Sequence, residues 1–281
     1  MPAEPAVRDP HAGDDAGFAT LLDKISRERG FGCASYKERC LRRRVAVRMR
    51  ATGVHTYSTY AELLDQRPAE WERLLDALTI NVTRLFRNRE TYEALSRIVV
   101  PELWQSPAAQ IRVWSAGCSS GEEPYSLAVL FHRYAAQRGE QGRAAARVRI
   151  LGTDIDATSL TAARRGEFEE SDFAETPEEL RAEYFAPTPP FGVLTAARAL
   201  VDFRRHDMLG EPPPERGVHL VMCRNVVIYF DRPSQEALFA RFHEALAPGG
   251  FLVLGKVETL LGAVRTLFVP VDARERIFRK S

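Results

Sequence analysis

Hydrophobic residues in the first third of the chain recur at intervals of three and four positions, which is the spacing of amphipathic helices. The repeats are Phe18, Leu21, Leu22 and Ile25; Leu41, Val45 and Met49; Tyr60, Leu63 and Leu64; and Trp71, Leu74, Leu75 and Leu78. Breaks follow at Gly30, Gly32, Gly53 and Pro68. The pattern predicts an all-helical domain over residues 18–80, preceded by a disordered leader at residues 1–17 that is rich in Pro, Ala and Asp.

After residue 110 the pattern changes to short apolar runs separated by helical segments. The runs cover residues 111–114, 148–153, 200–204, 218–223 and 251–254, and helical spacing marks 124–137, 157–165 and 234–246. Alternating strands and helices predict an α/β fold with a doubly wound, parallel sheet, which binds ligands at the carboxyl ends of its strands. The alternation over residues 268–278 predicts closing antiparallel strands.

A segment at about residues 171–200 interrupts this alternation. It contains Pro177, Pro187, Pro189, Pro190 and Gly192. Because structureless loops of this length are uncommon inside compact domains, we expect an inserted subdomain or lid within a sheet domain spanning residues 81–281.

A turn of small residues, Ser-Ala-Gly-Cys-Ser-Ser-Gly-Glu-Glu, follows the first predicted strand. Gly117 and Gly121 let the backbone approach the ribose and amino-acid portions of a ligand, because neither carries a side chain. The turn lacks the Lys-Ser/Thr pair of a P-loop and the full Gly-x-Gly-x-x-Gly of a dinucleotide site. With no cation to hold phosphates, a triphosphate ligand is disfavoured.

Polar side chains end two further strands. Asp154 and Asp156 close the second run, where an acidic side chain can accept hydrogen bonds from both hydroxyls of a ribose. This favours an adenosine-type ligand, although either residue can instead cap the helix that follows. Arg224 and Asn225 follow the strand at 218–223, and so polar a pair favours a functional site over a structural turn.

The sequence Asn-Val-Thr-Arg-Leu-Phe-Arg-Asn at residues 81–88 joins the two predicted domains. Its Asn, Thr and Arg side chains can line a cleft at the junction. An ordinary capped helix start with exposed arginines explains the same residues equally well.

Composition narrows the class of protein. The chain of 281 residues has a formal net charge of +1, so overall electrostatics favour neither nucleic acid nor membrane as a partner. The four cysteines form no Cys-x-x-Cys pair, which indicates reduced, mostly buried thiols and no metal site. No signal peptide or apolar stretch of 18 residues is present, so we expect a cytoplasmic protein that does not enter the membrane.

The segment at residues 37–50 contains seven basic residues and a single acidic one, Glu38. Arg39, Arg42, Arg43 and Arg50 fall within roughly a third of the circumference of the predicted helix. A solvated charged face is one interpretation. The other is a docking surface for an acidic partner, whose attraction weakens as salt concentration rises.

Four motifs together resemble one family. Asn-x-Thr-x-x-Phe-Arg, Ser-Ala-Gly-Cys-Ser-Ser-Gly-Glu-Glu-Pro-Tyr-Ser, Asp-Ile-Asp and Cys-Arg-Asn-Val-x-Ile-Tyr-Phe occur here in the order found in the CheR family, the S-adenosylmethionine-dependent glutamate methyltransferases of bacterial chemotaxis. The similarity extends from Tyr36-Lys37 almost to the C-terminus. It implies a Rossmann-like methyltransferase sheet, an N-terminal helical domain, a small inserted β subdomain and S-adenosylmethionine as cofactor, with S-adenosylhomocysteine as product and no metal.

The resemblance also assigns roles to individual residues. It implies cofactor contacts at Asn81, Thr83, Arg87, Glu123, Asp154, Asp207, Met208, Arg224 and Asn225, to which the glycine turn adds Gly117. Arg87 would orient the substrate carboxylate, and Tyr229 would lie near the reacting methyl group. The implied partner is the acidic helical bundle around a chemoreceptor's methylation glutamates, docked on Arg39, Arg42, Arg43 and Arg50.

This chain departs from the family pattern at several positions. Val82 replaces a usual Glu, Asp207-Met208 replaces a common Asn-Leu pair, and Lys256-Val257 replaces a frequent His-Ser pair. Residues 187–192 occupy the place of the glycine-rich loop that docks a receptor's C-terminal pentapeptide, so we expect no pentapeptide tethering. We also expect a monomer.

Three alternatives stay open. A nucleic-acid amino-methyltransferase is disfavoured, because the Asn/Asp-Pro-Pro-Tyr/Phe motif that grips a target amine is absent after the strand at 218–223. A cofactor-binding regulatory module without transfer activity is a second possibility. The third is a CheR-like methyltransferase that acts in a signalling pathway other than chemotaxis.

Overall fold

A computed structural model describes residues 14–79 and 83–281. The chain divides into two compact units. One consists of the N-terminal helices together with Tyr229–Ser234, and the other of the remaining chain from residue 83 onward. Within the described residues, no helix combines the length and the apolar character that crossing a membrane requires.

The helical unit contains the four predicted helices. They are α1 (Asp15–Arg29), α2 (Glu38–Thr52), α3 (Tyr57–Gln66) and α4 (Pro68–Leu78), with a short 3-10 turn η1 (Cys33–Ser35) between the first two. Helix α1 begins three residues before the predicted boundary at Phe18, so the predicted leader was too long. The reason is a local cap, since the Asp14 carboxylate accepts a hydrogen bond from the Gly17 N–H at 3.0 Å.

The apolar stripes predicted for the four helices meet in one core. Leu21, Val45, Tyr60 and Leu74 are all fully buried in it. A polar cluster lies beside this core, where Arg48 forms two hydrogen bonds with the carboxylate of Glu70 at 2.9 and 2.8 Å and the Tyr60 hydroxyl donates a third at 2.8 Å. Glu70 is only 3% exposed, and these partners satisfy its buried charge.

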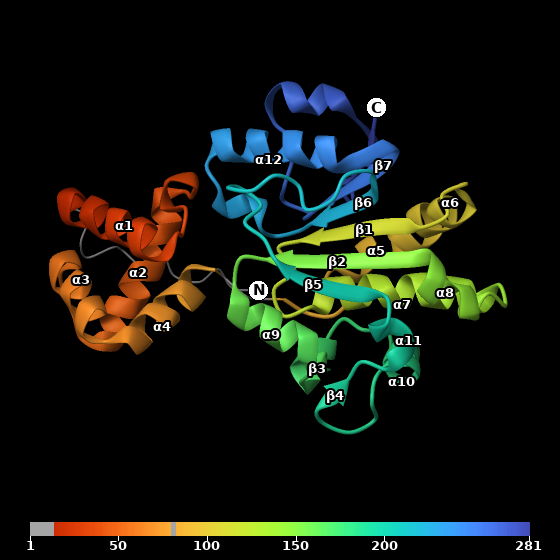
Figure 1. Cartoon of the computed structure of the whole chain (residues 1–281), viewed down its shortest axis with the longest axis horizontal. Coiled ribbons are helices and arrows are strands. Elements are labelled where there is room, and N and C mark those ends of the chain that lie inside the picture. Colours follow the sequence, from red (N-terminus) through yellow and green to blue (C-terminus); the bar gives the residue numbers. More distant parts are fainter. Residues whose placement is uncertain (1–13, 80–82) are drawn as a thin grey trace. The chain divides into compact units, whose positions relative to one another are not determined.

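The other unit is built on a seven-stranded sheet of order β5-β2-β1-β6-β7-β9-β8 (Figure 1). The strands are β1 (Ile111–Ala116), β2 (Val148–Asp154), β5 (Val201–Arg205), β6 (Val218–Cys223), β7 (Leu246–Leu254), β8 (Phe268–Asp272) and β9 (Ile277–Lys280). The first five of these pair in parallel, and β9 and β8 close the sheet in antiparallel pairs. The predicted α/β class, parallel sheet and antiparallel closure are therefore confirmed.

Helices cover both faces of the sheet. They are α5 (Arg89–Ala94), the π-helical turn η2 (Leu95–Val99), α6 (Val100–Gln105), α7 (Glu122–Gln137), α8 (Gln141–Arg147), α9 (Ala157–Arg165) and α12 (Arg232–Ala245). Figure 1 shows α7 and α12 on opposite sides of the strands. On the α12 side, Trp114 of β1 packs edge-on against Phe242, with ring centroids 5.4 Å apart. Helices α5 and α6 were not predicted, because the π-helical turn between them breaks the 3.6-residue period.

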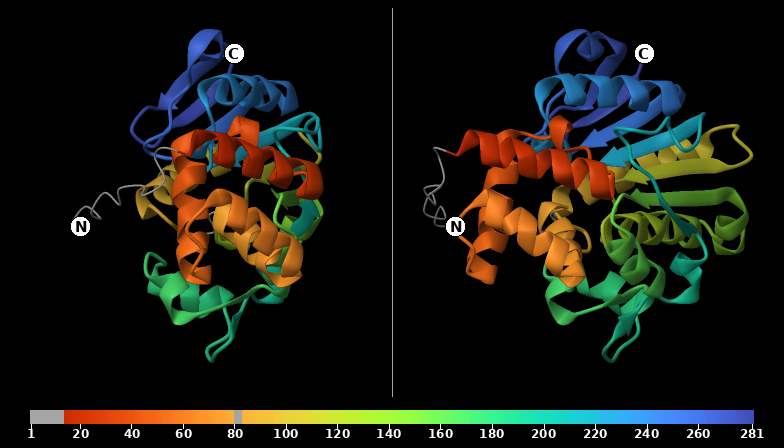
Figure 2. Two further views of the ribbon diagram at one scale, coloured as in Figure 1. Left: turned by 90° about the vertical axis from the view of Figure 1, so that its left-hand side faces the viewer. Right: turned by 60° about the vertical axis from the view of Figure 1, so that its left-hand side comes forward.

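The insertion is more helical than expected. A two-stranded antiparallel pair, β3 (Glu167–Phe168) and β4 (Phe191–Gly192), encloses the turn η3 (Glu170–Phe173) and helix α10 (Glu178–Tyr184), and the short helix α11 (Thr195–Arg198) follows. Its first strand begins before the predicted boundary at residue 171. Figure 2 shows this insertion and the C-terminal strands at opposite edges of the sheet.

Candidate functional site

The predicted loops converge at the carboxyl ends of β1, β2 and β6. After β1 the chain turns sharply, and the N–H groups of Gly117 and Cys118 both donate to the Thr153 carbonyl of β2, at 2.8 and 2.9 Å. Gly117 has a φ of 77°, and a Cβ atom built there would lie 2.7 Å from Cγ2 of Val226 in the loop after β6. Glycine is therefore required at this position for both conformation and space.

Asp154 connects the end of β2 to the glycine loop. Its carboxylate accepts hydrogen bonds from the Ser119 N–H at 2.8 Å and from the Asp156 N–H at 3.0 Å. Burial raises the pKa of the Asp154 carboxyl, while these N–H donors lower it. A carboxylate has about four acceptor positions, so Asp154 retains acceptor capacity beyond these backbone donors.

Asp156 has the capping role that was left open for both aspartates. Its carboxylate accepts from the Thr158 N–H at 2.9 Å and from the Ser159 hydroxyl at 2.6 Å, at the start of α9. Asp154 does not cap this helix. The two aspartates, only two positions apart, thus have separate functions.

Two adjacent glutamates begin α7 beside the glycine loop. The Glu123 carboxylate accepts from the Ser115 hydroxyl at 2.7 Å, and burial raises its pKa to about 7 against the opposing charges of Arg224 and Arg87. Glu122 was not predicted as a site residue. It is 4% exposed, accepts from the Ser120 hydroxyl, and has its pKa raised to about 7 by burial. Its burial could not be read from a helix start that looks like an acidic first turn.

Arg224 is a buried cation in the loop after β6. It is 6% exposed, its Nη2 donates to Oδ1 of Asn88 at 2.8 Å, and its guanidinium carbon lies 5.6 Å from the ring centroid of Tyr92. The Nε atom is buried without a hydrogen-bond partner among the described residues. A buried guanidinium with a free donor is suited to receive an acceptor group of a ligand.

The conformation of Asn225 depends on Glu258, which ends the Gly-Lys-Val-Glu motif at residues 255–258 and to which the sequence assigned no role. Asn225 has a positive φ of 61°. The Glu258 carboxylate accepts from the N–H groups of Asn225 at 3.1 Å, Gly255 at 2.6 Å and Ile228 at 3.3 Å. Burial raises the pKa of Glu258, and these N–H donors oppose that shift. Glu258 therefore holds the loop that carries Arg224 and Asn225.

The Asp207-Met208 pair follows β5 and lies next to the glycine turn. The Asp207 carboxylate accepts from the Leu209 N–H at 2.9 Å and so stabilises its own turn. The methyl group of Met208 lies 3.3 Å from a Cβ built at Gly117. Arg241 of α12 donates to the Met208 carbonyl at 2.8 Å and so connects this loop to α12.

The remaining predicted contacts are placed as follows. The Thr83 side chain hydrogen bonds to Glu122, and the positive charge of half-buried Arg87 acts on the carboxyl of Glu123. Asn81 lies outside the described residues. Half-buried Tyr229 ends the 3-10 turn η4 (Val227–Tyr229) and belongs by its contacts to the helical unit, so its position near a reacting methyl group stays a prediction.

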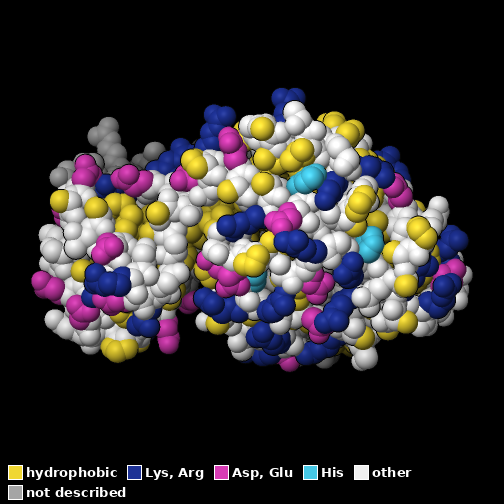
Figure 3. Space-filling view, turned by 45° about the horizontal axis from the view of Figure 1, so that its top comes forward, with side chains coloured by type: hydrophobic (Ala, Val, Ile, Leu, Met, Phe, Trp, Pro, Cys, Tyr) yellow, Lys and Arg dark blue, Asp and Glu magenta, His cyan; other side chains and the backbone are white. Residues whose placement is uncertain are grey.

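The basic face of α2 is smaller than predicted. Arg39, Arg43 and Arg50 are exposed. Arg42 is not part of this face, because its guanidinium pairs with Asp15 and Glu38 at 2.6 Å and lies 4.2 Å from the ring centroid of Phe18. Elsewhere, on the face that Figure 3 shows, acidic and basic side chains are interspersed.

The residues at the strand ends fit the expected nucleoside cofactor. Three buried polar atoms here lack a hydrogen-bond partner among the described residues, namely Ser119 Oγ, Arg224 Nε and Asn225 Oδ1. Unsatisfied buried polar groups are rare in folded proteins, and here they come from two loops that flank Gly117. Together with the free acceptor capacity of Asp154, they supply the donors and acceptors that a ribose and an amino-acid group need.

Comparisons with known proteins agree with this geometry. Residues 81–277 match the model of the CheR methyltransferase SAM-binding domain, and residues 16–79 match that of the CheR all-alpha domain. The chain is 34% identical over 238 residues to a chemotaxis protein methyltransferase of Listeria monocytogenes, covering 84% of this chain and 87% of that protein. It is 34% identical over 248 residues to chemotaxis protein methyltransferase 1 of Pseudomonas aeruginosa, covering 86% and 89%. A relative from Klebsiella aerogenes with the name chemotaxis protein methyltransferase is 31% identical over 266 residues, covering 91% and 87%.

Proposed function

Because this chain belongs to the CheR family of S-adenosylmethionine-dependent methyltransferases, we propose that it methylates glutamate side chains on the cytoplasmic helical bundle of a chemoreceptor. The product would be a glutamyl methyl ester. The observation that carries this proposal is the set of buried, unpartnered polar atoms beside Asp154 and Gly117, which is complementary to the family's cofactor.

S-adenosylmethionine supplies a methyl group on a positively charged sulfur. Asp154 would hold the ribose hydroxyls through its remaining acceptor positions, and Arg224 would bind the carboxylate of the amino-acid portion. Glu123 would accept from the ammonium group of that portion. Because burial raises its pKa to about 7, this acceptor is fully ionised only above neutral pH.

The substrate needs little activation. A glutamate carboxylate with a pKa near 4.3 is already ionised at neutral pH, so no general base is required to make its oxygen nucleophilic. Catalysis then depends on alignment and on a site that excludes water. Arg87 is the proposed orienting group for the carboxylate, and Tyr229 the proposed wall of the methyl pocket.

The exposed arginines of α2 are the proposed docking surface. Arg39, Arg43 and Arg50 are exposed on one side of α2, whereas Leu41, Val45 and Met49 lie in the core and Arg42 and Arg48 form ion pairs within the helical unit. An acidic receptor bundle is complementary to this charge. Such attraction mainly raises the rate of association, and it weakens as ionic strength rises.

Methyl transfer is tested with methyl-labelled S-adenosylmethionine and receptor-containing membranes from the same cells. Carboxyl methyl esters are released as methanol by mild base, whereas methylated amines are not. We expect base-labile label on a membrane protein, and strongly reduced labelling by the Asp154→Ala variant at a cofactor concentration below the Kd of that variant. Base-stable label would redirect the assignment to amines or nucleic acid, and cofactor binding without transfer to any receptor would indicate a regulatory module.

A further inference from the structure

Asn88 lies at the end of the family motif at residues 81–88 but has no role in the cofactor contacts inferred so far. It has a left-handed backbone conformation, with φ 58° and ψ 70°, and it immediately precedes helix α5. Asparagine tolerates this conformation better than most residues with a side chain. A strained residue at such a place persists only where its surroundings hold it.

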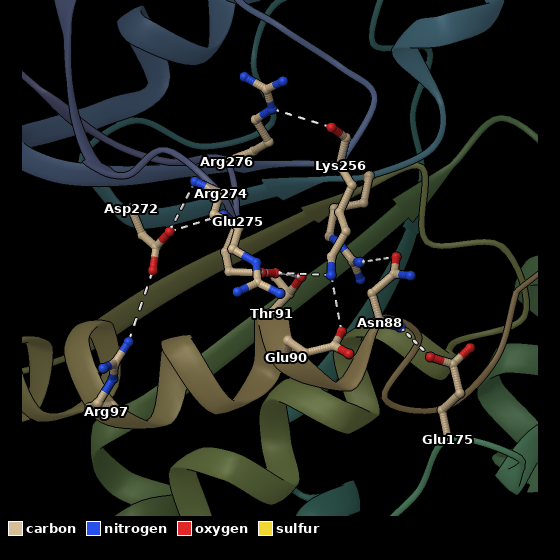
Figure 4. Close-up of polar contacts among 11 residues, drawn as sticks. Asn88, Glu90, Thr91, Arg97, Glu175, Lys256, Asp272, Arg274, Glu275 and Arg276 are labelled. Atoms are coloured by element: carbon tan, nitrogen blue, oxygen red, sulfur yellow. Dashed lines mark hydrogen bonds and ion pairs between the residues drawn. The ribbon is translucent and has the colours of Figure 1, made fainter.

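Two side chains from different parts of the sheet unit hold Asn88. Its N–H donates to the Glu175 carboxylate of the insertion at 2.6 Å (Figure 4), and its Oδ1 accepts from Arg224 at 2.8 Å. One turn further along, the ring of Tyr92 faces the same guanidinium. Asn88, just before α5, and Tyr92, within α5, therefore both contact the Arg224 guanidinium.

This helical turn is itself fixed from the side of the C-terminal hairpin. The Thr91 hydroxyl donates to the buried Glu275 carboxylate at 2.7 Å, and Lys256 bridges Glu90 at 3.0 Å and Glu275 at 3.6 Å (Figure 4). Of the side chains on this turn named here, Asn88 and Tyr92 are the two that contact Arg224. The Arg224 guanidinium therefore donates to Asn88 Oδ1 and also interacts with the Tyr92 side chain, and both partners belong to a helical turn that Thr91 and Glu90 hold in place.

We infer that Asn88 is a positioning residue that sets the orientation of the Arg224 guanidinium for cofactor binding, and that Glu175 connects the insertion to the cofactor site through Asn88. The inference rests on the proposed function, because Arg224 is a cofactor contact only in that assignment. With Nη2 bound to Asn88 Oδ1, the Nε of Arg224 is buried and has no partner among the described residues. Without Asn88 Oδ1, the guanidinium is free to rotate toward other acceptors.

The test uses variants of the full-length protein that separate orientation from backbone strain. Asn88→Gly deletes the amide and relieves the positive φ, whereas Asn88→Asp keeps an acceptor oxygen and tolerance of that φ. We expect Asn88→Gly to weaken S-adenosylhomocysteine binding about tenfold in calorimetry, the effect of losing a hydrogen bond to a charged group. Asn88→Asp should restore most of this affinity. The unfolding temperatures of the two variants should not follow the order of their affinities, because the effect on binding does not arise from a loss of stability.

Glu175→Ala should weaken binding in the same direction but less, and its effect should not add to that of Asn88→Gly, because both act through one residue. Glu179→Ala is the matched control, since it removes an exposed ion pair with Arg133 from the same insertion. Unchanged affinity in Asn88→Gly, or equal losses in all four variants, would overturn the inference. A wild-type protein that binds no S-adenosylhomocysteine would instead contradict the proposed function.

Discussion

Asp154 and Asp156 have identical side chains two positions apart, yet they form different contacts and therefore have different roles. Asp154→Ala removes the acceptor that faces the glycine loop, and we expect at least a tenfold loss of S-adenosylhomocysteine affinity in calorimetry. Asp156→Ala removes the cap of α9, which should lower the free energy of unfolding by about 1 kcal/mol and leave the affinity unchanged. Equal affinity losses in the two variants would remove Asp154 from the site.

Glu122 connects protonation to stability. Burial raises its pKa to about 7, whereas an unfolded glutamate titrates near 4.3. Between these values the folded protein binds a proton that the unfolded chain has released. The stabilisation from this group is therefore complete below about pH 4.3 and is lost as the pH rises through 7.

We expect Glu122→Gln to remove this pH dependence, because the amide has a similar size and cannot ionise. Relative to wild type, the cofactor-free variant should gain up to about 3 kcal/mol of unfolding free energy at pH 8 and little at pH 4.5. Urea denaturation at both pH values measures the difference. Glu179→Gln, at an exposed position, should show no such trend, and a gain in Glu122→Gln that is independent of pH would refute the assignment.

Helix α2 illustrates how one sequence segment distributes its charges. Periodicity alone placed Arg42 with Arg39, Arg43 and Arg50, but a helical wheel does not show what packs beside it. Helix α1 places Asp15 and Phe18 against Arg42, so the Arg42 guanidinium is paired within the helical unit and is not available to a partner. The proposed docking surface is therefore reduced to the three exposed arginines, Arg39, Arg43 and Arg50.

Charge reversal tests this surface. Arg39→Glu combined with Arg43→Glu should raise the KM for receptor at least fivefold at low salt, with the KM for S-adenosylmethionine unchanged, because rim charges act mainly on association. The difference should shrink at high ionic strength. Arg143→Glu with Arg216→Glu, two exposed arginines outside α2, is the control for overall charge. A similar KM increase in this control would assign the effect to net charge rather than to α2.

The strands and most helices could be predicted because each reflects a local pattern of apolar residues. The acid at the end of β2, the glycine turn and the Arg224-Asn225 pair were also predictable, since a parallel sheet gathers its strand ends at one edge. Asn88 and Glu258 were not. Each acts through a partner that is distant in sequence. Asn88 and Arg224 are 136 residues apart, and Glu258 and Asn225 are 33 residues apart. No periodic pattern of residues predicts such a contact.

The same limit applies to the division of the chain. A boundary at residues 80 and 81 follows from the change in pattern, but the helical unit also includes Tyr229–Ser234. Lys37 N–H donates to the Tyr229 carbonyl at 2.9 Å, and Asp231 N–H donates to the Ser35 carbonyl at 2.9 Å. A late segment of the chain thus completes the start of α2.

Phe230 is the apolar centre of this added segment. It is 3% exposed, and its ring packs edge-on against Tyr36, which in turn stacks on Phe31. Truncating a buried phenylalanine typically costs about 3 kcal/mol or more. We therefore expect Phe230→Ala to increase hydrogen exchange at residues 33–49, almost two hundred positions earlier in the sequence, by lowering the free energy of local opening.

The matched variant is Phe242→Ala, which removes a fully buried ring from α12 in the sheet unit. Its exchange increase should fall on α12 and β1, where Trp114 loses its partner, and should spare residues 33–49. If Phe230→Ala instead loosened only the neighbouring residues 220–245, the segment would belong to the sheet unit in solution. The predicted pattern would mean that the family motif ending in Ile-Tyr-Phe serves two units at once, with Arg224 and Asn225 in the cofactor site and Phe230 in the core of the helical unit.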